Sequence, residues 1–269
     1  MTIPVALTIA GSDSGAGAGI QADLKTFAAF GIYGVTVITA VTAQNTLGVR
    51  AVQEIEPQTI AAQLDAVAED FSIGALKTGM LSSAAIVEAV AAGIRRHSLQ
   101  PVVVDPVMVA KSGDRLLRQD AVEALRRRLL PLARLVTPNI PEAEVLSGRA
   151  IRSRDDRMVA ARAIIELGAQ AVVIKGGHSD DDPIVDLLID QTGVHEYRAP
   201  RIDTSSTHGT GCTFSAAITA ALARGHDLAA AVGEARDYVS QALLAAPGLG
   251  HGHGPMNHFP LAEAPRARR

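Results

Sequence analysis

P-V-V-V-D-P, residues 101–106, is a run of three β-branched residues that ends in an aspartate and a proline. A continuous apolar run without alternating polar residues is typical of a strand that is covered on both faces. The segment A-V-V-I-K-G-G, residues 171–177, repeats the pattern. Strands of this kind belong to parallel sheets with helices on both sides, so these two segments predict an α/β fold.

Similar runs alternate with helical stretches along the whole chain. Four more strands are expected, at 4–11, 34–43, 75–80 and 133–139. Ala- and Leu-rich stretches predict helices at roughly 18–30, 57–70, 82–97, 119–130, 155–167, 211–224 and 227–245. Two strand-like runs flank D-Q-T-G within 183–199 and predict an antiparallel hairpin at one edge. The expected fold is a mostly parallel central sheet flanked by helices on both faces.

Composition limits the possible function classes. With 48% hydrophobic and 20% charged residues in 269, the chain can bury one large core, which we expect to span residues 1–260 and to precede a short basic tail, 261–269. A net charge of -3 argues against nucleic acid and against a polybasic membrane surface. No apolar segment is long enough for a transmembrane helix, the N-terminus reads as a strand and not as a signal peptide, and one cysteine forms no internal disulfide. We therefore expect a cytoplasmic protein.

Polar residues follow several of the predicted strands. Ligands of open parallel sheets bind outside the carboxyl ends of the strands. Asp105, Asn139 and Glu142 offer the oxygen ligands that Mg²⁺ prefers beside a polyphosphate, although a proline turn at Asp105 and a helix cap at Glu142 are equally common local roles. Lys175 fits either a phosphate contact or a solvated strand end. The Gln44 carboxamide can meet an aminopyrimidine edge or cap a turn.

The segment T-S-S-T-H-G-T-G-C-T-F-S-A-A-I, residues 204–218, places the single cysteine after a glycine-rich turn. Gly209, Thr210 and Gly211 come directly before the predicted helix, so their N–H groups and that of Cys212 can converge on an anion. The helix dipole favours a thiolate, which predicts a lowered pKa for Cys212 and a role as proton acceptor. The alternative is a small buried residue that fills the start of the helix.

Seven ordered motifs carry a resemblance to a known family. They are A-G-S-D-S-G-A-G-A-G-I-Q-A-D-L-K, V-T-A-Q-N-T, K-T-G-M, V-V-V-D-P-V-M, T-P-N-I-P-E-A-E, V-V-I-K-G-G-H and T-H-G-T-G-C-T-F-S-A-A-I. Together they closely resemble the hydroxymethylpyrimidine/phosphomethylpyrimidine kinases of thiamine biosynthesis, which belong to the ribokinase-like superfamily. The resemblance covers nearly the whole chain, from about residue 8 to residue 259.

The resemblance implies a ribokinase-like kinase domain that uses ATP and Mg²⁺, forms a homodimer and phosphorylates an aminopyrimidine alcohol and then its monophosphate. It implies that Cys212 is the base and that Gly209, Thr210 and Gly211 hold the transferred phosphoryl group. The implied pyrimidine contacts are Gly11, Asp23, Gln44, Met80 and Val107. The implied ATP contacts are Lys175, Asn139 and Thr210, and the implied Mg²⁺ site is formed by Asp105, Asn139 and Glu142.

Two positions depart from the family pattern. Ala16 stands within Gly15-Ala16-Gly17, where the family usually has G-G-A-G, and a positive φ there would shift the pocket entrance. Ser206 replaces a common asparagine before T-H-G-T-G-C. The segment 108–116 is expected to be either a mobile lid or an ordinary surface loop.

Three other functions stay open. A pyridoxal kinase of the same superfamily would also phosphorylate a hydroxymethyl group on an aromatic ring, although Gln44 and Met80 favour the aminopyrimidine. A nucleotide or pyrimidine sensor would keep the fold without catalysis. A metal protein is suggested by His251, His253 and His258, since clustered histidines bind Zn²⁺.

Overall fold

The computed structural model describes residues 3–109, 113–114, 116–178 and 182–259. The expected basic tail, 261–269, and residues 110–112 and 115 of the expected lid lie outside the described residues. Within these ranges, no helix combines the length and the apolar character needed to cross a membrane.

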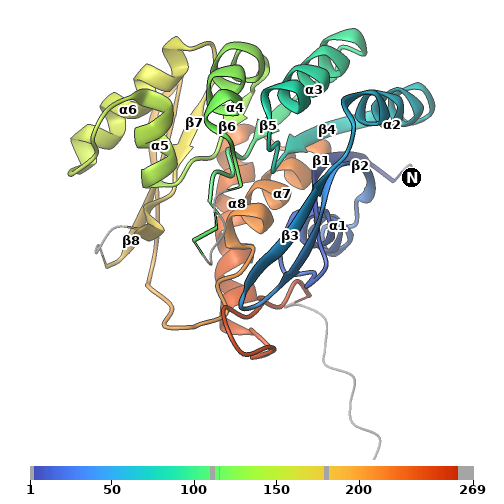
Figure 1. Cartoon of the computed structure of the whole chain (residues 1–269). Coiled ribbons are helices and arrows are strands. Elements are labelled where there is room, and N and C mark those ends of the chain that lie inside the picture. The colour runs from blue at the N-terminus through green and yellow to red at the C-terminus, as the bar shows by residue number, and fades with distance from the viewer. Residues whose placement is uncertain (1–2, 110–112, 115, 179–181, 260–269) are drawn as a thin grey trace, which may run out of the picture.

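One sheet organises the described chain, in the strand order β3-β2-β1-β4-β5-β6-β7-β8-β9 (Figure 1). The six central strands, β2, β1, β4, β5, β6 and β7 in sheet order, are mutually parallel. The strand β3 at one edge and the β8–β9 hairpin at the other are antiparallel to their neighbours. The strands are β1 Val5–Asp13, β2 Tyr33–Asn45, β3 Gly48–Glu54, β4 Ile73–Thr78, β5 Val102–Val104, β6 Leu135–Val136, β7 Val172–Ile174, β8 Ile184–Asp190 and β9 Gly193–Ala199.

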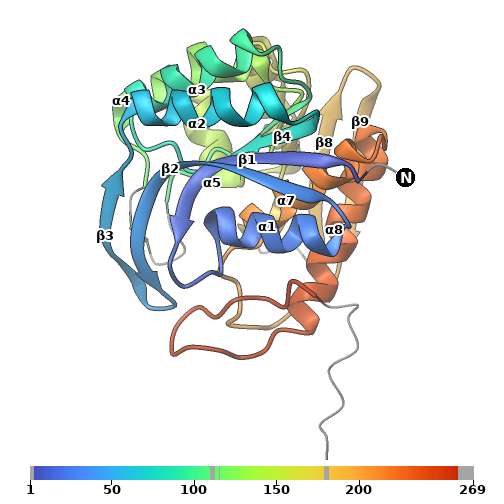
Figure 2. The same ribbon diagram turned by 90° about the vertical axis from the view of Figure 1, so that its right-hand side faces the viewer.

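Helices cover both faces of the sheet, as the apolar runs predict (Figure 2). Val102 and Val104 of β5 pack into one core cluster with residues of α2 to α6, while Val103 packs into another with residues of α7 and α8. Because successive strand residues point to opposite faces, a strand buried on both sides needs an apolar residue at every position. The helices are α1 Gly19–Ala29, α2 Pro57–Asp70, α3 Ala84–Arg96, α4 Gln119–Ala124, α5 Ile140–Ser147, α6 Arg154–Glu166, α7 Thr210–Ala223 and α8 Leu228–Leu244.

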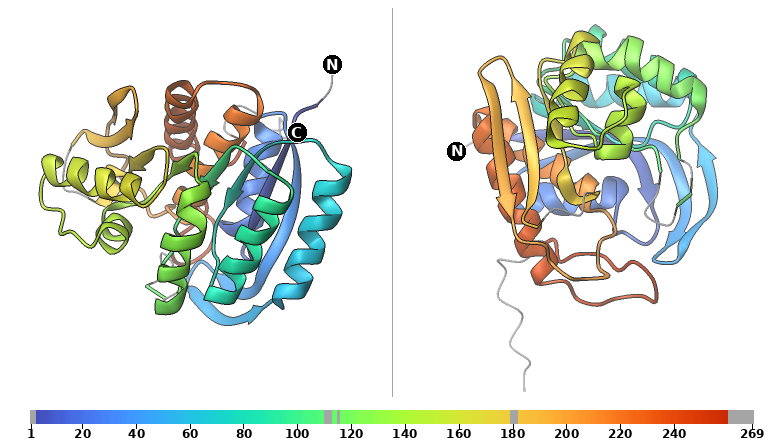
Figure 3. Two further views of the ribbon diagram at one scale, coloured as in Figure 1. Left: turned by 90° about the horizontal axis from the view of Figure 1, so that it is seen from above. Right: turned by 90° about the vertical axis from the view of Figure 1, so that its left-hand side faces the viewer.

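The hairpin expected within 183–199 is confirmed. β8 and β9 pair antiparallel around a turn at 191–192, and the hairpin stands beside α8, where the Tyr197 hydroxyl donates to the Ala229 carbonyl at 2.8 Å (Figure 3). The expected helix at 119–130 is shorter than predicted. The regular helix α4 ends at Ala124, a π-turn covers Leu125–Leu129, and Pro131 lies in a short 3-10 turn.

The strand β3 was not expected from the sequence. Most of its residues are exposed, so it lacks the apolar run that marks the central strands. It follows β2 through a short connection and pairs with it in antiparallel register, from Ala40 opposite Glu54 to Asn45 opposite Gly48. The pair extends β2 past the end of its neighbours and places Gln44 beside the carboxyl end of β1.

Candidate active site

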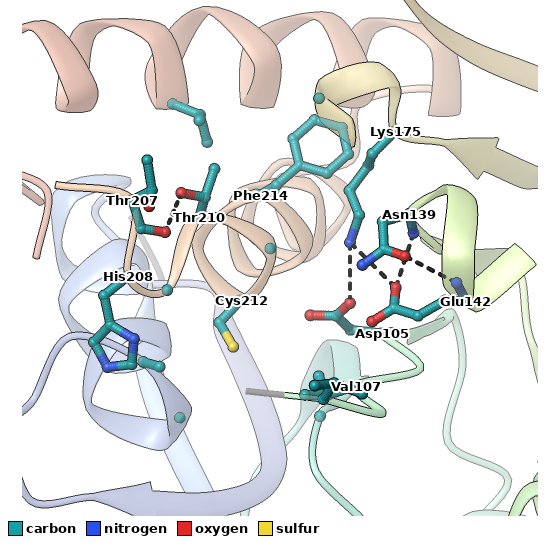
Figure 4. A pocket seen from close by; sticks show the side chains of 18 of the residues that line it. Asp105, Val107, Asn139, Glu142, Lys175, Thr207, His208, Thr210, Cys212 and Phe214 are labelled. Carbon is teal, nitrogen blue, oxygen red and sulfur yellow. Dashed lines mark hydrogen bonds and ion pairs between the residues drawn. The ribbon is translucent and has the colours of Figure 1, made fainter. Parts of the chain in front are cut away.

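A cavity of about 650 Å³ lies at the carboxyl ends of the parallel strands (Figure 4). This is the edge at which open α/β sheets bind ligands, and the volume is within the range of small-molecule sites. All but one of the site residues predicted from the sequence line the cavity. The lining residues among them are Gly11, Gln44, Met80, Asp105, Val107, Asn139, Glu142, Lys175, Gly209, Thr210, Gly211 and Cys212.

Asp23 is the exception. It is fully buried in α1 and does not line the cavity. One carboxylate oxygen accepts a hydrogen bond from the Thr8 hydroxyl at 2.6 Å, and the other lies 2.7 Å from Lys77 Nζ. Contrary to the prediction, Asp23 is therefore too deeply buried to contact a pyrimidine in the cavity. Asp23 supports the cavity wall from behind by holding Lys77.

Lys77 was not among the predicted site residues. It lies at the end of β4, is completely buried, and lines the cavity. Besides the ion pair with Asp23, its ammonium donates to the Cys212 carbonyl at 3.3 Å, which ties β4 and α1 to the first turn of α7. Burial opposes the charge, but the Asp23, Cys212 and Asp105 groups outweigh it and raise the pKa of Lys77. A lysine inside the short apolar strand I-G-A-L-K-T was the only signal that could have revealed it.

Asp105, Glu142 and Lys175 form a charged cluster on one side of the cavity (Figure 4). Lys175 Nζ lies 3.4 Å from Asp105 Oδ1 and 3.9 Å from Glu142 Oε2. Asp105 is also held by the Ser215 hydroxyl, which donates to Oδ2 at 3.1 Å. The Lys175 ammonium thus faces carboxylates and the cavity, so it is not a solvated strand end.

The protonation of this cluster follows from its burial. Burial opposes the charge on Lys175, but the Asp105 and Glu142 carboxylates outweigh it and raise the pKa of the ammonium. Burial raises the pKa of the Glu142 carboxyl to about 7; Lys175 opposes this shift and Asp105 adds to it. Two carboxyl groups with a single lysine between them leave the cluster short of positive charge.

Asn139 and Glu142 also perform the local role that the sequence left open. Asn139 is the N-cap of α5, and its Oδ1 accepts from the Glu142 amide at 2.9 Å while Glu142 Oε2 accepts from the Asn139 amide at 2.8 Å. This reciprocal capping box starts α5 and fixes both side chains at the cavity wall. Capping and ligand binding are compatible here, because each side chain still borders the cavity.

These residues fit a divalent cation that is held partly through water. Mg²⁺ takes oxygen ligands, keeps several waters and commonly binds through one or two carboxylates together with substrate phosphates. The Asp105 and Glu142 carboxylates supply such oxygens, and both lie next to the single Lys175 ammonium at the cavity wall. In the described part of the chain, no three His, Cys, Asp or Glu side chains gather into a closed metal site.

The turn before α7 is shaped as an anion cradle. Gly209 is the N-cap with φ +78°, a conformation that glycine adopts readily. A Cβ at Gly209 would lie 1.8 Å from the Gly17 carbonyl oxygen, and one at Gly211 would lie 3.3 Å from Lys175 Nζ. The helix begins at Thr210, so the N–H groups of its first turn have no acceptor within the helix. The Thr210 amide donates to the Thr207 carbonyl at 3.4 Å, and Gly211 and Cys212 line the cavity.

Cys212 is half-buried and lines the cavity from the first turn of α7, with Lys77, Asp105 and Gly19 around it. The predicted lowering of its pKa is wrong for the ligand-free site. Burial raises the pKa of the thiol to about 12, the Asp105 and Asp23 carboxylates add to the shift, and Lys77 and the Gly19 amide oppose it only partly. A helix N-terminus is therefore not sufficient to form a thiolate when the sulfur is desolvated beside carboxylates.

Gln44, Met80, Gly11 and Val107 also line the cavity. The Val107 amide donates to the Asp105 carbonyl at 2.9 Å, so Val107 lies beside the charged cluster. Met80 is buried, and a Cβ at Gly11 would lie 3.3 Å from its sulfur, so glycine leaves room for the thioether. Gln44 is held by its neighbours: its backbone amide donates to the Ser14 hydroxyl at 2.8 Å, and the Thr42 hydroxyl donates to Gln44 Oε1 at 3.2 Å. These residues combine a carboxamide with apolar side chains at the cavity wall.

Ala16 and Ser206, the two departures from the family pattern, differ in backbone conformation and burial. Ala16 has φ +58°, so an alanine occupies a left-handed position in the first loop. Ser206 is buried, and its amide donates to the Thr204 hydroxyl at 3.1 Å.

The histidines near the C-terminus do not form a metal site in the described chain. His258 is instead buried against α7 and α8: its Nε2 lies 3.1 Å from Thr213 Oγ1, and its carbonyl accepts from the Tyr238 hydroxyl at 2.6 Å. The amides of His251 and His253 donate to Thr46, at the connection between β2 and β3.

The parallel sheet with its antiparallel edges, the anion cradle and the carboxylate–lysine cluster are those of a ribokinase-like small-molecule kinase. The sequence model of phosphomethylpyrimidine kinase matches residues 13–257. The chain belongs to the phosphomethylpyrimidine kinase family.

Known proteins show the same relationship. The chain is 51% identical to the hydroxymethylpyrimidine/phosphomethylpyrimidine kinase of Bacillus subtilis, over 96% of both chains. It is 50% identical to the thiamine biosynthesis bifunctional protein ThiED of Geobacter sulfurreducens, over 97% of this chain and 54% of that protein. The fold superposes with a TM-score of 0.90 on an ADP complex of Bacillus subtilis pyridoxal kinase, at 42% identity over 97% of this chain and 99% of the other.

Proposed function

We propose that the protein transfers the ATP γ-phosphoryl group to the hydroxymethyl oxygen of 4-amino-5-hydroxymethyl-2-methylpyrimidine, and then phosphorylates the monophosphate to the diphosphate, in thiamine biosynthesis. The observation that carries the proposal is one cavity lined by two differently built groups of residues. We call the Gln44 carboxamide with the Met80 thioether the pyrimidine end, and the anion cradle with the carboxylate–lysine cluster the phosphoryl end. Cys212 lies beside the cradle (Figure 4).

In the proposed reaction, the hydroxymethyl oxygen attacks the γ-phosphorus, the bond from that phosphorus to the β-bridging oxygen breaks, and ADP leaves with the bond's electron pair. The hydroxyl proton passes to Cys212 Sγ. Phosphoryl transfer depends mainly on positioning and charge neutralisation. The first-turn amides of α7 bind the migrating group, and Lys175 binds the ATP phosphates together with Thr210 and Asn139. A protonated thiol cannot accept this proton, and the pKa of Cys212 is raised in the ligand-free site, partly by Asp105. We therefore infer that Cys212 reacts as the thiolate, which forms once a cation bound at Asp105 and Glu142 offsets the charge of these carboxylates.

The same proposal assigns a Mg²⁺ site to Asp105 and Glu142, with Asn139 beside them. The cation would neutralise charge on the phosphates as the bond between the γ-phosphorus and ADP breaks. Asp105 is positioned for this by Ser215, and Glu142 by the capping box of α5. Gln44 would hydrogen-bond the aminopyrimidine edge, while Gly11, Met80 and Val107 would contact the ring.

The proposal is tested by ADP release with purified protein, ATP and Mg²⁺. We expect turnover with hydroxymethylpyrimidine and with its monophosphate, and loss of most turnover in Cys212→Ala with ATP binding retained. A fully active alanine variant would overturn the assignment of Cys212. Binding of ATP and pyrimidine without ADP release from the wild type would identify a non-catalytic sensor instead.

Pyridoxal kinase is a second candidate, because the fold matches the Bacillus subtilis pyridoxal kinase at 42% identity. Pyridoxal also presents a hydroxymethyl group on a nitrogen-containing ring. We expect a higher kcat/KM for hydroxymethylpyrimidine than for pyridoxal, since Gln44 offers a donor and an acceptor to the aminopyrimidine edge. Strong preference for pyridoxal in the same assay would reverse the assignment of the substrate.

We further propose that the protein works in the cytoplasm as a homodimer. The β2–β3 edge pair supports an interface between two copies, because Val41 and Val52 are 46% and 43% exposed. Val41 pairs with Gln53 and Val52 with Thr42, so the two valines lie on opposite faces of the pair. An edge strand with exposed apolar residues favours association with a second copy. Sedimentation equilibrium is expected to give twice the chain mass of 27.9 kDa, and Val41→Glu with Val52→Glu is expected to give the monomer.

A further inference from the structure

Asp13 is the centre of a hydrogen-bond cluster that the proposed chemistry does not use. It is buried at the end of β1, and its Oδ1 accepts from the Gly15 amide at 2.8 Å. Its Oδ2 accepts from the Gly17 and Ala18 amides at 3.0 and 2.8 Å. The Asp13 carboxylate therefore folds the loop 13–19 around itself.

His208 provides a further contact to the same carboxylate from a distant part of the chain. Its Nε2 lies 2.8 Å from Asp13 Oδ2, and the ring is buried. His208 directly precedes Gly209, the N-cap of the anion cradle. Its own amide donates to the Gly254 carbonyl at 3.1 Å, so the C-terminal segment holds the histidine from the other side.

The backbones of the two loops approach each other as closely as glycine allows. A Cβ at Gly17 would lie 2.3 Å from the His208 ring, and a Cβ at Gly209 would lie 1.8 Å from the Gly17 carbonyl oxygen. The cradle therefore rests directly on the first loop. The Asp13–His208 contact joins the two loops at this point.

The two loops contact different groups of the residues that line the cavity. Ser14 of the first loop accepts from the Gln44 amide and donates to the Gln44 carbonyl at 2.7 Å, which connects this loop to the pyrimidine end. The loop 207–212 forms the phosphoryl end. Asp13 and His208 both line the cavity between them.

We propose that Asp13 and His208 form a positioning pair that fixes the anion cradle relative to the pyrimidine end, and so sets the distance between the accepting alcohol and the transferred phosphoryl group. This proposal rests on the proposed kinase function. An in-line transfer needs the reacting atoms about 3 to 3.5 Å apart, and a 1 Å misplacement costs about 100-fold in rate. The pair acts through the cradle, and its loss is expected to reduce kcat more than substrate binding.

Three variants test the proposal. His208→Leu removes the donor to Asp13, His208→Gln keeps a donor near the position of Nε2, and His97→Leu is the matched control. His97 makes a contact of the same type with Asp65, at 2.7 Å, at the remote end of α3. We expect His208→Leu to lower kcat for hydroxymethylpyrimidine by about 10- to 100-fold with KM for ATP changed less than about threefold. His208→Gln should recover at least part of this loss, and His97→Leu should keep the wild-type kcat.

A kcat for His208→Leu within twofold of wild type would overturn the proposal. A loss in His97→Leu equal to that in His208→Leu would also overturn it, because general destabilisation would then explain both. Thermal unfolding of each variant shows whether it is folded at the assay temperature.

Hydrogen exchange separates this inference from the proposed function, because it needs no substrate. In His208→Leu, we expect faster exchange of the amides of Gly15, Gly17 and Ala18 with unchanged exchange in α3, and partial recovery in His208→Gln. Unchanged exchange of these three amides would refute the coupling of the loops even if the kinase assay succeeds. If wild-type protein does not phosphorylate hydroxymethylpyrimidine, the proposed function fails while the exchange result still decides the coupling.

Discussion

At the scale of single residues, the Lys77–Asp23 pair shows how a buried ion pair can shape the wall of a site. Both side chains have no exposed surface, and three elements meet at the Lys77 ammonium. Removing one member of such a pair leaves an uncompensated charge in a region of low dielectric constant. The pair therefore matters mainly through the cost of breaking it.

We predict that Lys77→Met lowers the free energy of unfolding by about 3 to 5 kcal/mol. The double change Lys77→Met with Asp23→Asn should be less destabilising than Lys77→Met alone, since no charge is then left unpaired. Arg96→Met breaks an exposed pair with Asp65 and should cost at most about 1 kcal/mol. Urea unfolding of all three measures this, and equal losses for Lys77→Met and Arg96→Met would contradict the interpretation.

Ala16 is a residue whose identity conflicts with its backbone conformation. Its φ of +58° is unfavourable for any residue with a Cβ, by about 1 to 2 kcal/mol. Its carbonyl still accepts from Lys25 Nζ at 2.8 Å, so the surrounding contacts hold the loop in place. We predict that Ala16→Gly raises the free energy of unfolding by about 1 kcal/mol, after the extra backbone entropy of glycine is subtracted. Denaturant unfolding is the measurement, and a destabilised glycine variant would contradict this account.

At the scale of elements, the start of α5 combines a structural and a functional position in the same two residues. The sequence pattern P-N-I-P-E, residues 138–142, allowed both a cap and a cation site, and spacing alone could not decide between them. The structure shows that the cap is formed and that the same side chains border the cavity. A helix whose cap is a binding residue places that residue with little freedom.

The two roles can be separated with a second helix. Ser153 caps α6 in the same way, accepting from the Asp156 amide at 3.1 Å, but it does not line the cavity. We predict that Asn139→Ala and Ser153→Ala each cost about 1 kcal/mol of stability. Only Asn139→Ala should also raise KM for ATP, by at least threefold. Steady-state kinetics together with thermal unfolding test this prediction. Equal kinetics in the two variants would show that Asn139 acts only as a helix cap.

At the scale of the whole molecule, the fold could be predicted where local pattern and topology agree. Apolar runs such as 102–104 identified the central strands, and the parallel arrangement then placed Asp105, Asn139 and Lys175 at one edge. Other features depend on long-range contacts that no local pattern records. These include the exposed strand β3, the direction of Lys77 into the interior and the desolvation that raises the pKa of Cys212.

The C-terminal segment, residues 249–259, belongs to these long-range features. It connects the β2–β3 turn at Thr46, the loop at His208, and the helices α7 and α8, which are far apart in the sequence. His258 is the buried anchor of the segment, 3% exposed between Thr213 and Tyr238. Burial lowers the pKa of the imidazole to about 4, and the nearby Lys25 adds to the shift.

The lowered pKa of His258 predicts a pH dependence of stability with a definite sign. Between the ordinary pKa of 6.5 and about 4, the unfolded chain binds a proton at His258 that the folded chain does not. This histidine therefore leaves stability unchanged above pH 6.5 and reduces it as the pH falls from 6.5 to 4, by at most about 3 kcal/mol. His258→Gln removes the titrating group, so the stability difference between wild type and variant should shrink as the pH falls through this window. His226→Gln changes a partly exposed histidine and is the control. Urea unfolding at pH 7.5, 6.0 and 5.0 measures both differences, and a wild-type advantage over His258→Gln that stays constant across these values would show that His258 does not report the burial of the segment.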